Sequence, residues 1–136
     1  MPLLVDTSVW SLAYRRDALP DVPEVRALRE ALGGGDAVVT TGIILLELLR
    51  GFVPERAQQT ICADLGVLES VEPRWADYEA AAELRNACRR HGVHLGAVDS
   101  LLAQLAIAHE LTLLTTDRDF VHAAACIPLR VWMPGQ

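Results

Sequence analysis

Four acidic residues of this chain end or interrupt apolar runs. They are Asp6 in LLVDTSVW, Glu47 in GIILLELLRG, Asp99 in GAVDSLLAQLA and Asp117 in LTLLTTDRDF. Asp and Glu side chains are rarely buried in a protein unless they are paired or bind a metal ion. Because four such placements occur, 41, 52 and 18 residues apart, we expect the fold to gather them into one carboxylate cluster. Such a cluster is a site for hard divalent cations.

Each acid taken alone also has an ordinary structural role. Asp6 could cap a helix that begins after it, and Asp99 could be a common first-turn acid of a helix. Glu47 could form an ion pair with Arg50 three residues later. Asp117 could be a turn or capping residue. None of these roles explains why all four acids follow or interrupt apolar runs, so we favour the cluster.

The elements that must position these acids alternate between strands and helices. Short apolar runs predict strands at 3–5, 37–40, 111–114 and 129–132, and 67–71 fits either a strand or a loop. Helical spacing of apolar residues predicts helices at 9–16, 24–32, 43–49, 55–65, 75–91, 98–110 and 120–125. This alternation predicts a mostly parallel sheet covered by helices on both faces. The excess of helix in the middle of the chain predicts a protruding helical pair.

Two of the acids lie where such a sheet binds ligands. Asp6 and Asp117 each end a predicted strand, and ligands of open parallel sheets bind outside the carboxyl ends of the strands. Asp99 lies in the first turn of a predicted helix, where the helix dipole favours an anion. Glu47 lies within a helix that is apolar around its whole circumference. The acids are therefore expected to meet at one edge of the sheet.

Length and composition indicate a single domain over residues 1–136 with a proper hydrophobic core. The chain has 136 residues, of which 51% are hydrophobic. No apolar run reaches the ~18 residues needed to span a bilayer, and the N-terminus lacks the basic region of a signal peptide, so we expect a cytoplasmic protein without membrane contact. Three cysteines without a CxxC pair argue against a zinc site or a disulfide framework.

Two other classes of α/β protein that carry a strand-end aspartate do not fit this sequence. A haloacid dehalogenase phosphatase needs a second acid two residues after its strand-end aspartate, where this chain has Ser8. A response-regulator receiver needs a late lysine, and all twelve basic residues here are arginine. The net charge of −6 argues weakly against nucleic-acid binding. That objection softens if the acids bind divalent cations.

The quoted segments resemble, in order and spacing, those of PIN-domain ribonucleases, and within them the VapC toxins. The matching pieces are LLVDTSVW, ILLELLRG, GAVDSLLAQLA and LLTTDRDF, which together cover essentially the whole chain. The resemblance implies a PIN-like three-layer α/β/α sandwich and a metal-dependent endoribonuclease. It further implies the toxin of a type II toxin–antitoxin system, which cleaves cellular RNA, inhibits translation and growth, and is neutralised by a VapB-like antitoxin.

The resemblance also implies which residues act. The catalytic and metal-binding acids fall on Asp6, Glu47, Asp99 and Asp117, with Asp119 as an extra carboxylate and with Thr7, Ser8 and Thr116 as hydroxyls that orient the acids or a water. Mg²⁺ is the expected cofactor, with Mn²⁺ as an alternative, and we expect Asp6 and Asp99 to be direct ligands. Arg50 and Arg118 each neighbour a proposed acid and are expected to contact RNA phosphates.

Other interpretations stay open at this point. The chain could be a PIN-like module that binds RNA or protein with weak or no catalysis, or a housekeeping PIN ribonuclease. Transfer, ribosomal and messenger RNA are all candidate substrates. A homodimer is suggested by the family and by an apolar excess that includes Leu45, Leu48 and Leu49.

Overall fold

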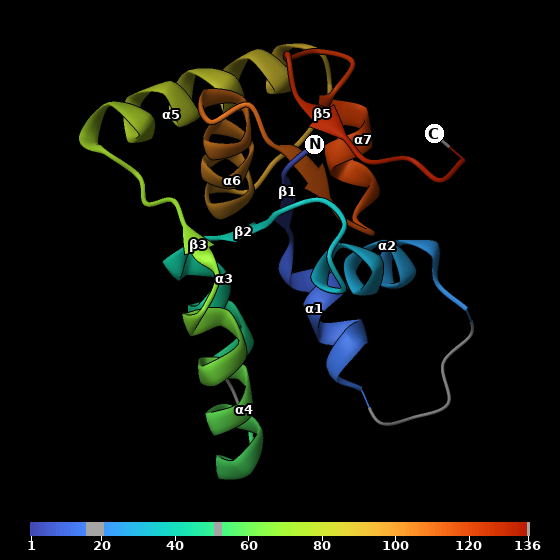
Figure 1. Cartoon of the computed structure of the whole chain (residues 1–136). Helices are drawn as coiled ribbons and strands as arrows, with labels where there is room; N and C mark the ends of the chain where they lie inside the picture. Colours follow the sequence, from blue (N-terminus) through green and yellow to red (C-terminus); the bar gives the residue numbers. More distant parts are fainter. Residues whose placement is uncertain (16–20, 51–52, 136) are drawn as a thin grey trace.

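The computed structural model describes residues 1–15, 21–50 and 53–135 (Figure 1). Within them, the elements in chain order are β1 (Leu3–Val5), α1 (Thr7–Tyr14), α2 (Pro23–Leu32), β2 (Val38–Thr40), α3 (Gly42–Leu49), α4 (Glu55–Gly66), β3 (Glu69–Ser70), α5 (Trp75–Arg90), α6 (Ala97–Ala108), β4 (Thr112–Leu114), α7 (Arg118–Ala123) and β5 (Arg130–Val131). No helix in the described part of the chain is long and apolar enough to cross a membrane.

The strands form one sheet in the order β3-β2-β1-β4-β5, and every pairing is parallel. The central strand β1 pairs with β2 through Leu4 and Val39, and with β4 through Leu4 and Leu113. Strands β1, β2 and β4 are buried along their whole length. Burial on both faces explains why these strands are continuous short apolar runs and do not alternate with polar residues.

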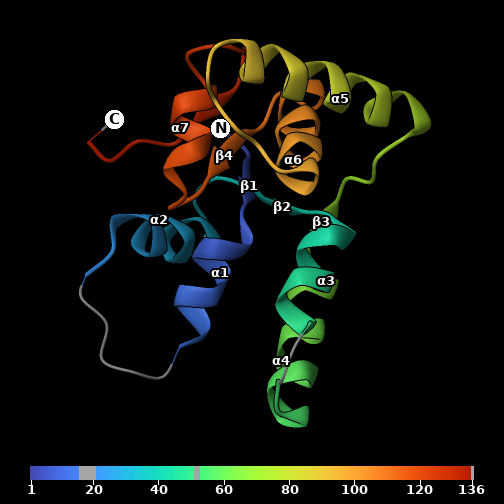
Figure 2. The same cartoon turned by 180° about the vertical axis from the view of Figure 1, so that it is seen from behind.

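Helices cover both faces of the sheet, so the predicted three-layer sandwich is confirmed. Helices α5, α6 and α7 lie on one side of the sheet, and α1 to α4 lie on the other (Figures 1 and 2). This division follows from right-handed crossovers, since the chain moves from β1 toward β3 first and later from β4 to β5 in the opposite direction. The core lies between the sheet and these two layers.

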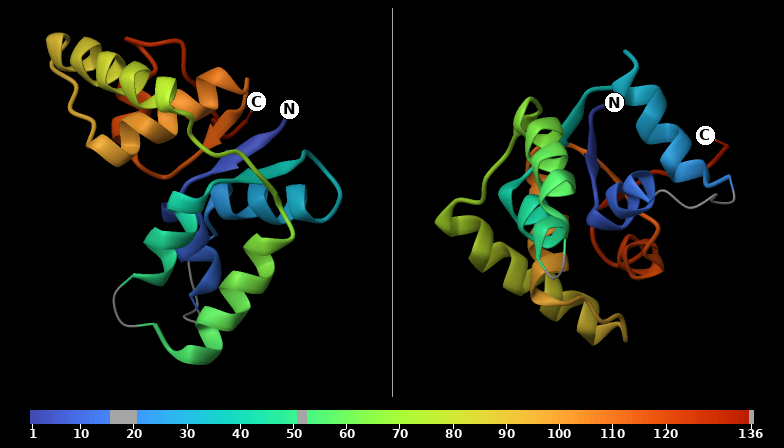
Figure 3. Two further views of the ribbon diagram at one scale, coloured as in Figure 1. Left: turned by 90° about the vertical axis from the view of Figure 1, so that its left-hand side faces the viewer. Right: turned by 90° about the horizontal axis from the view of Figure 1, so that it is seen from below.

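The predicted protruding helical pair is formed by α3 and α4. Figure 3 shows α4 extending away from the sheet alongside α1. Tyr14 at the end of α1 donates its hydroxyl to Asp64 Oδ2 of α4 at 2.7 Å, and its ring stacks on Trp10 at a centroid distance of 6.0 Å. Burial and the neighbouring Asp64 carboxylate raise the pKa of the Tyr14 hydroxyl. This contact ties the extended hairpin back to the body of the protein.

Several helix boundaries differ from the predicted ones for local reasons. The first helix begins at Thr7, because Asp6 has extended backbone angles and occupies the N-cap position; its predicted end at residue 16 lies outside the described residues. Helix α7 begins at Arg118, two residues earlier than expected, since the Asp117 carboxylate accepts the Asp119 N–H at 2.9 Å. Helix α6 ends at Ala108, before the left-handed backbone of Glu110 at φ 54°. Of residues 67–71, only Glu69–Ser70 form a strand.

Candidate active site

The two strand-end aspartates lie at the same edge of the sheet. Asp6 follows β1 directly, and Asp117 follows β4 by three residues. Because β1 and β4 are parallel neighbours, their carboxyl ends coincide, and the Asp6 N–H donates to Leu114 O at 2.9 Å. The sequence-based expectation that these acids share one edge is met by the register of these two central strands.

Two side-chain hydroxyls, those of Ser8 and Thr115, join the ends of β1 and β4. Ser8 Oγ and Thr115 Oγ1 both donate to Asp6 Oδ2, at 2.9 and 2.8 Å. Thr115 Oγ1 also accepts the Asp117 N–H at 3.0 Å, and Ser8 Oγ accepts the Thr116 N–H at 3.1 Å. Each hydroxyl therefore donates a hydrogen bond to the Asp6 carboxylate and accepts one from a backbone N–H of the loop after β4. Together they hold Asp6 and the Asp117 loop in a fixed relation.

Thr115 is the member of this network that sequence reasoning missed. Thr116 was expected to contribute its hydroxyl, but its recorded bond to the network comes from its backbone N–H, and its side chain is exposed. Thr115 is 5% exposed and directly follows the buried strand β4. A buried threonine that precedes an acid by two residues was the available signal.

Glu47 reaches the same region from the helical layer. Glu47 Oε1 accepts a hydrogen bond from the Thr7 hydroxyl at 2.8 Å. Because Thr7 directly follows Asp6, this bond holds Glu47 near the end of β1. Glu47 is partly exposed even though Ile44 and Leu48 on the same helix are buried. The helix therefore turns its one carboxylate toward Thr7 and the edge of the sheet.

Asp99 completes the group from the first turn of α6. Its side chain is half-buried, and its pKa rises from 3.8 to about 6. Burial is the main cause, followed by the negative charges of Asp6, Asp117, Glu47 and Asp119 in that order. The charges of the other three predicted acids and of Asp119 therefore all act on the Asp99 carboxylate.

Asp6 is the most buried acid of the cluster, at 7% exposed. Burial raises its pKa, and the Glu47 charge raises it further, whereas hydrogen bonds from Thr115, Ser8 and the Thr7 backbone lower it. The hydroxyls thus stabilise the ionised carboxylate against the cost of its burial. A desolvated carboxylate beside other acids is an arrangement typical of functional sites.

Asp77 is a buried acid of the same protein with a purely structural role. It accepts the Arg74 N–H at 2.8 Å at the start of α5 and an N–H of Gln104 at 3.2 Å. These bonds, with the Arg74 backbone N–H first, lower the pKa of Asp77. Its carboxylate is held by donors and faces no acid cluster, so its burial is explained by helix capping. Asp6 and Asp99 differ because their pKa values are raised.

The donor set fits a hard divalent cation, although the acids do not form a closed coordination shell. The cluster offers carboxylate and hydroxyl oxygens, the ligands that Mg²⁺ and Mn²⁺ prefer. Across residues 1–15, 21–50 and 53–135, no three His, Cys, Asp or Glu side chains meet as a metal-binding group. Mg²⁺ commonly binds through one or two carboxylates and retains several waters.

The two arginines named as RNA contacts are both exposed. Arg50 caps the end of α3, and Arg118 opens α7 directly after Asp117. Asp119 is also exposed, and its backbone N–H supports the Asp117 carboxylate. Arg50 thus ends the helix that carries Glu47, and Arg118 directly follows Asp117 in the chain.

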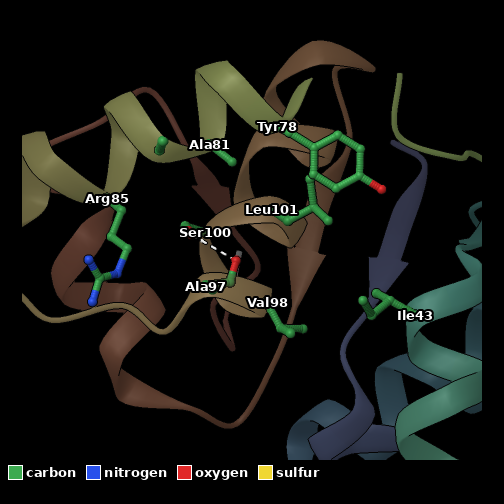
Figure 4. A pocket seen from close by; sticks show the side chains of 9 residues that line it. Ile43, Tyr78, Ala81, Arg85, Ala97, Val98, Ser100 and Leu101 are labelled. Atoms are coloured by element: carbon green, nitrogen blue, oxygen red, sulfur yellow. Dashed lines mark hydrogen bonds between the residues drawn. The ribbon is translucent and has the colours of Figure 1, made fainter. Parts of the chain in front are cut away.

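An apolar groove lies beside this edge, between α3, α5 and α6. It has a volume of about 360 Å³ and is lined by residues that include Ile43, Tyr78, Val98 and Leu101 (Figure 4). Leu46 of α3 is 62% exposed beside it and lines an adjoining hollow of about 310 Å³.

The leucines named in the apolar excess of the sequence do not line this groove. Leu48 is buried in the core, and Leu45 and Leu49 pack against it. These three leucines therefore contribute mainly to the core, and the predicted homodimer stays a prediction. Leu46 is the exposed leucine of this helix.

The parallel sheet, the helical layers and the acid cluster at the carboxyl edge define an α/β protein with a carboxylate-lined active site. The PIN domain family matches residues 3–125, and the chain belongs to this family. No match was found among curated protein sequences.

Solved structures share the fold across nearly the whole chain. VapBC2 from Rickettsia felis bound to a promoter DNA fragment is 23% identical, with 97% of this chain and 98% of that chain covered and a TM-score of 0.76. FitAcB from Neisseria gonorrhoeae is 22% identical, with 97% of each chain covered and a TM-score of 0.71. VapC20 from Mycobacterium tuberculosis, described as a sarcin–ricin loop cleaving toxin, is 20% identical, with 94% and 98% covered and a TM-score of 0.67.

Proposed function

We propose that this protein is the toxin of a type II toxin–antitoxin pair, a cytoplasmic Mg²⁺-dependent endoribonuclease that inhibits translation and growth, with Mn²⁺ as an alternative cofactor. The observation that carries the proposal is that Ser8 and Thr115 join Asp6 to the loop that carries Asp117. The charges of the other acids also help to raise the pKa of Asp99. Membership of the PIN domain family and the similarity to toxin–antitoxin complexes support it.

The residues of the chain have distinct tasks in this reaction. Asp6 and Asp99 would hold the cation directly, and Glu47 and Asp117 would bind it directly or through water. When bound, the cation would supply an activated water and positive charge for in-line cleavage of the phosphodiester. Thr115 keeps Asp6 ionised and aligned, because it donates to that carboxylate.

Around these acids, the remaining polar residues support the site. Thr7 holds Glu47 through their 2.8 Å hydrogen bond, and Asp119 adds negative charge beside Asp117. Arg50 and Arg118, which neighbour Glu47 and Asp117 in the chain, bind RNA phosphates, since arginine matches phosphate oxygens with two parallel donors.

A cleavage assay tests the activity. Purified protein is incubated with cellular RNA and Mg²⁺ or Mn²⁺, with and without EDTA. We expect cleavage that EDTA abolishes and that Asp6→Asn and Asp99→Asn lose, while the exposed-site control Glu83→Gln keeps it. Cleavage that survives EDTA or either aspartate substitution contradicts the proposal.

The proposed partner is a small VapB-like antitoxin that covers the acid cluster with basic residues. The cluster and the net charge of −6 favour a basic segment there. We expect expression of the chain alone to arrest growth and co-expression of the cognate partner to restore it. Arrest that persists in Asp6→Asn supports a binding module in place of a nuclease.

The proposed assembly is a homodimer that buries the apolar groove between α3, α5 and α6. Exposed Leu46 and Tyr78 at the rim of the groove favour a second copy of the chain as its occupant. Leu46→Arg is expected to give a monomer in sedimentation equilibrium, whereas Leu32→Arg, at a leucine of α2 that is 50% exposed, leaves the dimer intact. A dimer in both variants places the interface elsewhere.

A further inference from the structure

A second hollow lies at the same edge of the sheet, on the β5 side of the acids. It has a volume of about 180 Å³ and lies between the start of α2, the β4–α7 connection and the segment after β5. Thr115 and Thr116 line it. Because Thr115 also donates to Asp6, one residue forms part of both the hollow and the acid cluster. Residues of α2 and of α7 both line the hollow.

The lining combines apolar surface with two opposite charges. Val121, Trp132 and Met133 supply apolar and aromatic surface, and Trp132 is partly exposed. Glu24 from the first turn of α2 and Arg118 from α7 supply a carboxylate and a guanidinium. Pockets for drug-sized ligands measure about 300–1,000 Å³, so this smaller hollow suits a single ring system.

We propose that this hollow is a nucleobase pocket, in which the enzyme holds one unstacked base of its RNA next to the bond that it cleaves; this rests on the proposed ribonuclease activity. Single-stranded RNA is recognised through bases that stack on aromatic or arginine side chains and bond through their edges. Trp132 offers the stacking surface, and Arg118 offers the charge for the adjoining phosphate. Thr115 lines the hollow and also contacts Asp6, so one side chain lies between the pocket and the acid cluster. The RNA chain then continues from the pocket across the acids.

Glu24 gives the pocket a base preference. A carboxylate accepts hydrogen bonds from exocyclic amino groups, as Asp and Glu do with N4 of cytosine. Uracil has no amino group to donate. The pocket is therefore selective for an amino-bearing base over uracil, and cytosine is the ring of the size that the hollow suits.

A binding experiment tests the pocket without relying on cleavage. The full chain in EDTA is titrated with CMP and with UMP by isothermal calorimetry. We expect CMP to bind more tightly than UMP, and Trp132→Leu to weaken CMP binding about tenfold, since base stacking on an aromatic side chain has an effect of this order. Trp75→Leu is the matched control, because Trp75 is 83% exposed on α5, outside the pocket.

A cleavage map then tests the role of the pocket in specificity. The ends left in a random-sequence single-stranded RNA pool are sequenced for the wild type, Trp132→Leu and Glu24→Gln. We expect a preference against uracil at one position near the cut, which Glu24→Gln relaxes. Glu24 lies in the first turn of α2 and is not buried, so Glu24→Gln is expected to fold. This variant still tests the pocket if Trp132→Leu fails to fold.

The outcomes separate this proposal from the one it rests on. If the wild type cleaves no RNA but binds CMP through Trp132, the ribonuclease proposal fails and the pocket stands. CMP affinity and cleavage preferences that are unchanged in Trp132→Leu and Glu24→Gln overturn the pocket. Loss of neutralisation by the antitoxin in Trp132→Leu, with CMP binding and cleavage preferences unchanged, also overturns it and assigns the hollow to the partner protein.

Discussion

Replacing Asp99 by asparagine is expected to stabilise the protein in the absence of divalent cations. Asp99 is half-buried, and burial first, followed by the charges of four other acids, raises its pKa from 3.8 to about 6. Its ionised form is therefore less favourable in the folded protein than in the unfolded chain. Asparagine keeps the shape of the side chain and removes the charge. The substitution is therefore expected to remove the proposed cation ligand and to increase the free energy of unfolding.

The size of the gain follows from the pKa shift. A rise of about two units corresponds to ~3 kcal/mol at most, and solvent screening of a half-exposed carboxylate lowers this to about 2 kcal/mol. Loss of the favourable charge in the first turn of α6 removes a further ~0.5 kcal/mol. The net gain of about 1–1.5 kcal/mol corresponds to a rise in Tm of roughly 4–6 °C for a chain of this length.

The sign of the pH dependence is fixed by the direction of the shift. Because the folded pKa lies above the unfolded value, the contribution of Asp99 to stability is fully present below about pH 4. It is lost as the pH rises through about 6. Wild-type protein is therefore expected to lose stability between pH 4 and 7 relative to Asp99→Asn, and the difference between the two is largest above pH 7.

Thermal unfolding by circular dichroism in EDTA, from pH 4 to 8, measures the effect. Glu83→Gln, which removes an exposed carboxylate on α5, is the matched control and is expected to leave Tm nearly unchanged. Added Mg²⁺ is expected to raise the Tm of the wild type more than that of Asp99→Asn. An Asp99→Asn protein that is no more stable than the wild type at pH 7.5 in EDTA refutes the reasoning.

Three further substitutions test the contacts that position the site. Thr115→Val removes a buried donor to a carboxylate and is expected to cost about 1.5–3 kcal/mol in urea unfolding, whereas Thr116→Val changes stability by less than ~0.5 kcal/mol; equal effects would contradict the bridging role of Thr115. Tyr14→Phe removes the hydroxyl bond to α4 and is expected to lower stability by about 0.5–1.5 kcal/mol and to speed proteolysis of the α3–α4 hairpin, which a protease time course measures. Glu72→Ala removes the carboxylate that accepts the Gly42 N–H at 2.7 Å at the start of α3 and is expected to lower Tm by roughly 4 °C, with an unchanged Tm as the contrary result.

The sheet and the acid cluster were predictable because their signals are local and strong. Two-sided burial leaves short continuous apolar runs, and the residue after each run marks the carboxyl edge. Asp6 and Asp117 could therefore be assigned to the same edge before their strands were known to be neighbours. Asp99 followed from its place in a helix start, and its raised pKa agrees with a shared site.

The hydroxyl partners were harder to predict because they depend on side-chain direction across strands. Neighbouring threonines after β4 differ only by which side of the chain they face, and the strand register decides that Thr115 meets Asp6. Likewise, the direction of Glu47 depends on Thr7, which is forty residues away in the chain. The exposed leucine of α3 could not be identified either, since that helix is apolar on every side.

The order of the strands has a consequence for how the protein is made. Strand β1 is synthesised first but needs β4 beside it, and the residues that join the two strand ends come from both. A chain emerging from the ribosome at about 5–20 residues per second therefore lacks a complete carboxylate centre until residues 115–119 have left the exit tunnel. The proposed nuclease therefore cannot act before β4 and the loop after it have joined β1, and an antitoxin needs to meet only a chain that has folded this far.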